Sequence, residues 1–177
     1  FRNDPQMAQK AEAVSSIALD ITELLTKLDY RATQVVPPLK IAYHSACSLQ
    51  HGQKVTSEPV KLLEKAGFDV TPVPESHLCC GSAGTYNLLQ PELAGTLAAR
   101  KAANIESTGA DAVAAGNLGC IIQIAGATDI PVMHSVELLD WASGGPCPQA
   151  LEKFALPDGP QTHSPPGPTE FIISPGA

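Results

Sequence analysis

Short apolar runs with the character of β-strands alternate with helix-like segments between residues 38 and 143. The expected strands are residues 39–44, 68–73, 111–115 and 130–133. The segments between them carry apolar residues at the three- and four-residue steps of amphipathic helices. Strands and helices that alternate in this way form parallel sheets with right-handed crossovers. The pattern predicts an α/β fold, a four-stranded parallel sheet flanked by helices in a flavodoxin- or Rossmann-like three-layer arrangement.

The two ends of the chain have a different character from this central region. Residues 1–30 show one long apolar period and predict an amphipathic helix, which with the linker to residue 37 packs on the core. From Ser143 onward the chain holds 8 of its 16 prolines and no apolar period. We therefore expect a domain at residues 38–143 and a Pro/Gly-rich tail at 144–177 that is disordered or clasps a partner. A chain that begins at Phe1 is expected to be a piece of a longer protein.

Charge and cysteine content exclude several classes of function. The formal net charge of −7 argues against a nucleic-acid partner. No apolar run is long enough to cross a bilayer, and no signal peptide precedes the domain, which predicts a cytoplasmic location. Five cysteines are too few for a disulfide scaffold of this length. In a reducing compartment such cysteines are metal-binding, redox-active or buried.

Cysteines follow three of the four predicted strands. Cys47 follows the first strand, Cys79 and Cys80 follow the second, and Cys120 follows the third. In an open parallel sheet these exits lie along one edge, where such folds bind ligands. Helix N-termini at the same edge favour thiolates, and clustered thiolates suit zinc or an iron–sulfur cluster. We therefore predict a metal centre held by these four cysteines.

Other polar residues near these exits have simpler interpretations. The run Gly81-Ser-Ala-Gly84 resembles a nest for an anion, but it lacks the P-loop lysine, so it more simply gives the backbone room beside a bulky inorganic group. Cys147 falls in the tail and is expected to lie outside the site. Histidines at loop exits are more often surface residues, or support a ligand, than bind metal themselves; here they are His44, His51, His77 and His134.

The cysteine pattern Cys47, Cys79-Cys80-Gly81 and Cys120 resembles the cysteine-rich CCG domain. That domain occurs in heterodisulfide reductase, in anaerobic glycerol-3-phosphate dehydrogenase, and in lactate-utilisation and glycolate oxidase iron–sulfur subunits. Residues 5–142 are most similar to the C-terminal CCG repeat of the glycolate oxidase iron–sulfur subunit. The similar blocks are Tyr43-His-Ser-Ala-Cys-Ser-Leu-Gln-His-Gly-Gln53, Ser76-His-Leu-Cys-Cys-Gly-Ser-Ala-Gly-Thr-Tyr86, Gly116-Asn-Leu-Gly-Cys120 and His134-Ser-Val-Glu-Leu-Leu139.

This resemblance implies an electron-transfer role in a complex that oxidises glycolate to glyoxylate. It implies flavoprotein partner subunits, peripheral membrane association through the complex, and further parts of the same protein, which are a ferredoxin-like region and a first CCG repeat. The isolated domain is expected to have no turnover of its own. The resemblance also implies that the four cysteines are ligands and that Gly81 and Gly84 shape the turn beside the cofactor.

The sequence departs from the family pattern at its last ligand. The general motif ends in Cys-x-x-Cys, whereas this chain has Cys120-Ile-Ile-Gln123. The five-thiolate non-cubane cluster of heterodisulfide reductase therefore cannot be completed here. Four thiolates suit a 4Fe–4S cubane or a zinc ion, with Gln123 as a neighbour or weak ligand. Two alternatives stay open, a structural zinc or metal-free docking module and a dithiol reductase using Cys79 and Cys80, although adjacent cysteines form a strained disulfide ring.

Overall fold

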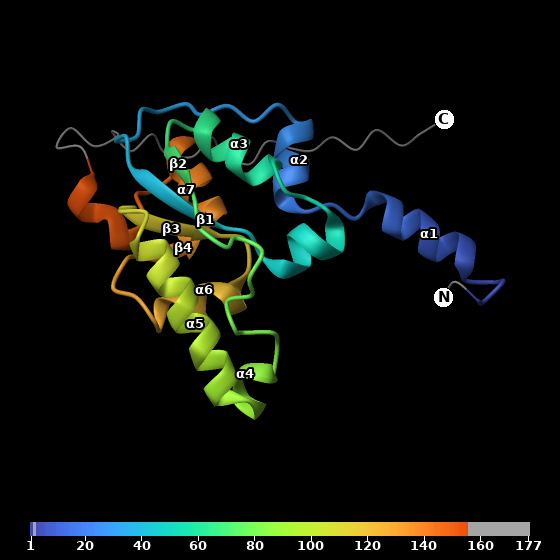
Figure 1. Cartoon of the computed structure of the whole chain (residues 1–177). Coiled ribbons are helices and arrows are strands. Elements are labelled where there is room, and N and C mark those ends of the chain that lie inside the picture. Colours follow the sequence, from blue (N-terminus) through green and yellow to red (C-terminus); the bar gives the residue numbers. More distant parts are fainter. Residues whose placement is uncertain (2, 156–177) are drawn as a thin grey trace.

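The computed structural model describes residues 1 and 3–155, and its core is an all-parallel sheet of four strands in the order β2-β1-β3-β4 (Figure 1). The predicted α/β class and the parallel sheet are confirmed. The strand bounds differ from the expected ones by a residue or two and are β1 (Lys40–His44), β2 (Asp69–Pro72), β3 (Ala112–Ala115) and β4 (Val132–His134).

The chain reverses its direction across the sheet between β1 and β3. From β1 it passes outward to β2, and then returns to add β3 and β4 on the other side of β1. The carboxyl ends of β1 and β3 are in register, with His44 opposite Ala115. In open α/β sheets a ligand crevice forms outside the strand ends at such a switch point. The order of strands thus places the segments after β1 and β3 on either side of the expected site.

Helices cover both faces of this sheet. On one face, α3 (Glu58–Lys65) and α7 (Ser135–Ala142) pack over Ile41, Ala112 and Ala114. On the opposite face, α5 (Pro91–Glu106) and α6 (Leu118–Ala125) contact each other, and their buried residues Ile105 and Ile124 lie with Ala42 and Val113. Successive strand residues point to opposite faces, as the pleat requires. The ribbon of α5 runs away from the sheet toward the short helix α4 (Tyr86–Leu89) (Figure 1).

The N-terminal region differs from the single helix expected for residues 1–30. It forms two helices, α1 (Ala8–Ile17) and α2 (Ile21–Lys27), and the break falls at Asp20, whose side chain caps α2. The Asp20 carboxylate accepts a hydrogen bond from Thr22, and the Glu23 carboxylate accepts one from the backbone of Asp20. None of the residues of α1 is buried, and α1 projects away from the sheet (Figure 1). Only α2 packs on the domain, against α3.

The first part of the predicted tail also packs on the domain. After α7, residues 149–154 form a 3₁₀ helix, η2 (Gln149–Phe154). Leu151 in this helix is completely buried in the apolar cluster between the sheet and α7. Residues 144–155 therefore pack on the domain, because Leu151 fills a place in the apolar cluster beside α7. Residues 156–177 of the predicted tail lie outside the described residues.

Candidate metal centre

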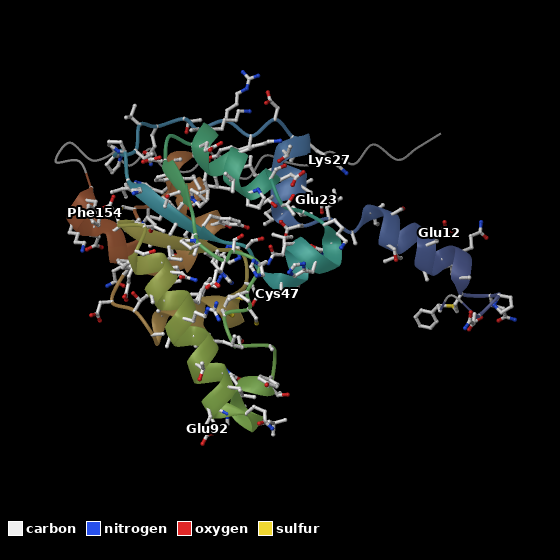
Figure 2. All side chains as sticks on the ribbon, in the orientation of Figure 1. Glu12, Glu23, Lys27, Cys47, Glu92 and Phe154 are labelled. Carbon is white, nitrogen blue, oxygen red and sulfur yellow. The ribbon has the colours of Figure 1, made fainter. Side chains whose placement is uncertain are left out.

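Cys47 lies where β1 gives way to the next helix. It directly precedes η1 (Ser48–Gln53), a single π-helical segment, where a simple loop was expected. Figure 2 labels Cys47 at this junction, beside the chain that leads from β2 toward α4. π-helical segments are uncommon and occur frequently at functional sites. The first predicted ligand is therefore at the predicted edge of the sheet.

The adjacent cysteines lie in the segment after β2, which is held against α5. The backbone N–H of Gly81 donates a hydrogen bond to the Cys79 sulfur at 3.3 Å. Gly81 has a φ of +93°, and a Cβ there would lie 2.4 Å from the carbonyl oxygen of Ala94 in α5. At Gly81 the cysteine loop thus approaches the backbone of α5 closely, where the sequence suggested room for an inorganic group. Cys80 is completely buried under this turn, and Cys79 is partly exposed.

Cys120 lies in the first turn of α6, whereas the sequence placed it in the loop before the helix. The Asn117 side chain caps α6 by accepting a hydrogen bond from the backbone N–H of Cys120 at 3.1 Å. Gly119 lets this turn approach the Cys80 loop, since a Cβ there would lie 2.8 Å from the Ser82 hydroxyl. The cap and the glycine together bring Cys120 next to Cys80.

His44 completes a group of three buried ligand types with Cys80 and Cys120. The three candidate ligand atoms all lie within 4.8 Å of one another. His44 is 1% exposed, and its Nε2 atom has no hydrogen-bond partner among the described residues. A buried polar atom without a protein partner is costly and is commonly satisfied by a water molecule, an ion or a ligand. The sequence predicted only a supporting role for His44. Its alternation with Ala42 along β1 nevertheless indicates that both side chains point to the same face of the sheet, the face on which Cys80 and Cys120 lie.

Charge is divided unevenly between Cys80 and Cys120. The Cys120 thiol, followed by the His44 imidazole and the backbone of Ser82, lowers the pKa of Cys80 well below the usual thiol range. The pKa of Cys120 is raised, first by its hydrogen bond with Cys80 and then by burial. The directions of these two pKa shifts mean that Cys80 gives up its proton more readily than Cys120. A thiolate and a neutral imidazole are the forms that bind metal ions.

Cys47 and Cys79 interact with each other but are not members of the group formed by His44, Cys80 and Cys120. Burial is the largest cause of the raised pKa of Cys47, and the charge and hydrogen bond of Cys79 come next. Cys80 also contributes to this shift, so the electrostatic fields of these cysteines overlap. The structure thus groups Cys80 and Cys120 with His44 at the edge where β1 and β3 end, and Cys47 and Cys79 adjoin this group.

The remaining candidate residues have other partners in the structure. The Gln123 side chain accepts a hydrogen bond from Asn87 at 3.2 Å and donates one to the Ala94 carbonyl at 3.4 Å, which links α6 to α4 and α5. Gly84 has a φ of +65° and open space around it, so the turn alone requires a glycine there. The imidazole of His134 caps α7. His51 and His77 are exposed.

Cys147 lies apart from this centre. It packs against the apolar cluster between the sheet and α7, whereas Cys80 and Cys120 belong to the cluster on the face of α5 and α6. Its thiol donates a weak hydrogen bond to the adjacent Pro148 carbonyl. It therefore offers a natural control for the other four cysteines.

The fold and the site define a class of protein. They describe a parallel α/β domain with thiols and one imidazole gathered at the switch point of its sheet. Such a set of donors fits a thiophilic metal or an iron–sulfur cluster, because it offers soft sulfur ligands in a mostly buried setting. The unpartnered Nε2 of His44 supports the same fit.

Residues 41–125 match the family of the cysteine-rich CCG domain, and this part of the chain belongs to that family. The chain is 40% identical to the glycolate oxidase iron–sulfur subunit of Escherichia coli K12 over 153 residues, which cover 86% of this chain and 36% of that protein. It is 30% identical to lactate utilization protein A of Bacillus licheniformis and 27% identical to that of Bacillus subtilis. Each of these two alignments covers 79% of this chain and 62% of the relative. The chain thus spans between about one third and two thirds of the length of these relatives.

No helix in residues 3–155 combines the length and the apolar character needed to span a bilayer.

Proposed function

We propose that this domain binds an iron–sulfur cluster and carries electrons for a flavin-dependent complex that oxidises glycolate to glyoxylate. The observation that carries the proposal is the group of Cys80, Cys120 and His44, with Cys47 and Cys79 at the same sheet edge, in a chain 40% identical to a protein named as an iron–sulfur subunit. The proposed partners are the flavoprotein subunits of that complex, together with a ferredoxin-like region and a first CCG repeat of the same protein as this domain. The proposed setting is cytoplasmic, with peripheral attachment to the membrane through the complex.

The four cysteines are the proposed ligands of a 4Fe–4S cluster. A bound cluster would accept and release single electrons. The residues around it keep the ligands in place. Gly81 lets the loop of Cys79 and Cys80 lie against α5, and Gly84 allows the turn that follows. Gln123, which already bonds with Asn87 and Ala94, is proposed as a neighbour that fixes α6.

A structural zinc ion is the second candidate, and one observation favours it. His44, Cys80 and Cys120 form a mixed nitrogen and sulfur set with ligand atoms within 4.8 Å. Closed zinc sites commonly use such sets of cysteine and histidine. In that case the domain would be a docking module of the same complex, and the electrons would pass through other regions.

The first experiment is metal and acid-labile sulfide analysis of protein purified without oxygen, with a visible spectrum before and after dithionite. Iron with matching sulfide and a band bleached by dithionite supports the cluster. Stoichiometric zinc without such a band supports the docking module. A protein that holds no zinc as purified, and no iron after reconstitution with iron and sulfide, contradicts both candidates.

Matched variants locate the site. Cys80→Ser and Cys120→Ser should lose the metal, since each removes a buried ligand at the centre of the group. Cys147→Ser should retain it, since that thiol lies in the other apolar cluster. His44→Leu separates the two candidates, because loss of metal in this variant is expected for the zinc set and not for a cluster held by four thiolates.

A further inference from the structure

Lys101 on α5 is the largest fully buried side chain of the described residues. It is 1% exposed and lies on the same helix face as Ala94 and Ala98, the face that α5 turns toward the core. Ala94 on this face meets Gly81, so α5 presents the lysine alongside the segment that carries Cys79 and Cys80. A lysine is almost never fully buried unless its charge is paired.

The protein gives this ammonium one hydrogen-bond acceptor. Its Nζ donates to the backbone carbonyl of Glu75 at 2.9 Å, four residues before Cys79. The Glu75 carboxylate is turned to other partners, since it accepts hydrogen bonds from Arg100 and from Asn104. Among the described residues, the ion pairs involve Asp29 and Glu75, and neither is formed with Lys101. The compensating negative charge must therefore come mainly from another group.

The loop that carries Cys79 and Cys80 lies along the same side of α5, because Glu75 is hydrogen-bonded to Lys101 and Gly81 lies against Ala94. Burial lowers the pKa of Lys101, and the negative charges of Cys47, then Cys80, oppose this effect more than that of Glu75 does. The relation is mutual, because Lys101 lowers the pKa of Cys47 against the effect of burial. Lys101 is thus a positive charge that α5 buries against the loop of Cys79 and Cys80, where its attraction to a thiolate is stronger than it would be in water.

We propose that Lys101 is a positioning residue whose buried positive charge balances the thiolate centre, holds metal there and raises the reduction potential of the group that the thiolates bind. This inference rests on the proposed function. Each electron that enters such a group adds negative charge, so a fixed ammonium beside it stabilises the reduced form more than the oxidised form. The hydrogen bond to Glu75 keeps the ammonium at the base of the cysteine loop.

The test compares Lys101→Met and Lys101→Gln with the parent protein, loaded with iron and sulfide without oxygen. Both variants remove the charge, and the glutamine keeps a donor for the Glu75 carbonyl. We expect the reduction potential, measured by dye-mediated titration of the visible band, to fall in both variants. A tenfold change in the relative affinity for the two redox states corresponds to about 59 mV for one electron, and we expect at least that shift.

Arg100→Met is the matched control. It removes a positive charge one residue away, on a side chain that is 59% exposed and therefore screened by solvent. The potential should stay unchanged in this variant. An equal fall in Arg100→Met and Lys101→Met would overturn the proposal, because the loop contact through Glu75 would then account for the effect. An unchanged potential in both Lys101 variants would overturn it directly.

Zinc binding to the metal-free proteins gives a readout that does not need the cluster. Competition with a chromophoric chelator should show at least tenfold weaker Zn²⁺ binding in Lys101→Gln and Lys101→Met, and unchanged binding in Arg100→Met. Equal Zn²⁺ affinity in all four proteins would contradict the proposal. If the parent protein takes up no iron and sulfide but binds Zn²⁺, the iron–sulfur role fails, and the zinc comparison still decides the role of Lys101.

Discussion

Replacing Gly81 with alanine tests how the cysteine loop is held against α5. The φ of +93° disfavours any residue with a Cβ, and the new Cβ would lie 2.4 Å from the Ala94 carbonyl oxygen. The left-handed conformation costs about 1–2 kcal/mol. The contact with Ala94 is with backbone, which cannot move aside like a flexible side chain, and overpacking of this kind costs a further 1–3 kcal/mol or so.

Gly84→Ala is the matched control for this substitution. Gly84 also has a positive φ, +65°, but no atom lies within 4 Å of the position its Cβ would take. We expect Gly84→Ala to show only the cost of the left-handed conformation. Gly81→Ala also carries the cost of the contact with Ala94, so its free energy of unfolding should be lower than that of Gly84→Ala by about 2 kcal/mol. For a protein of this size that difference is about 4–8 °C in Tm.

Thermal and urea unfolding of the metal-free proteins, followed by circular dichroism, measure this difference. Metal content of the same variants shows whether the loop still presents Cys79 and Cys80. Equal destabilisation in the two variants would refute the reasoning, because the contact between Gly81 and α5 would then contribute nothing.

Three further predictions concern the scaffold. The pKa of Glu75 is lowered from 4.5 to about 2, first by its hydrogen bond with Arg100. The ionised Glu75 therefore stabilises the protein fully above pH 4.5, and this stabilisation is lost as the pH falls toward 2. Urea unfolding at stepped pH should show the difference in stability between the parent protein and Glu75→Gln shrinking over that range. Leu151→Ala should cost about 2–5 kcal/mol in urea unfolding, because this side chain is fully buried, whereas an unpacked tail predicts no change. Asp20→Ala should cost about 1 kcal/mol through loss of the cap of α2, measured by thermal unfolding, and an unchanged Tm would show that α2 does not need it.

The sheet and the positions of the cysteines followed from sequence because two regular signals agreed. Apolar runs such as residues 112–115 are buried on both faces of the sheet, and segments with a helical period separate them. Parallel connections then force the strand exits to one edge, which is why Cys47 and Cys120 were expected to meet although they are far apart in the chain. The roles given to Gly81, Gly84 and Gln123 stay predictions.

Two differences between the predicted and the observed helices trace to helix-capping residues that the sequence contains. The sequence Asp20-Ile-Thr-Glu23 has the form of a capping box, which marks a helix start inside the stretch read as one helix. Asn117 marks the start of α6 in the same way, three residues before Cys120. The packing of Leu151 had no such signal, since it depends on which part of the core α7 leaves free.

His44 and Lys101 show what the arrangement of strands and helices adds. A histidine at the end of β1 and a lysine in the middle of α5 are unremarkable in sequence, and helix lysines are usually exposed. Both become unusual once the fold buries them beside thiols, one with a free nitrogen atom and the other with a single carbonyl acceptor. Their burial with few or no hydrogen-bond partners, which no local sequence pattern encodes, therefore drew attention to both residues.

The construction of the centre links metal binding to folding. The predicted ligands come from the end of β1, the loop after β2 and the first turn of α6, so we expect no short segment to bind a metal ion alone. The folded protein without metal has a Cys80 thiol of lowered pKa, an Nε2 atom of His44 without a protein partner and a buried side chain at Lys101. Each is unfavourable in a buried setting, and a bound cation or cluster removes the first two costs directly. We therefore expect a metal bound at the proposed centre to raise the stability of the folded domain.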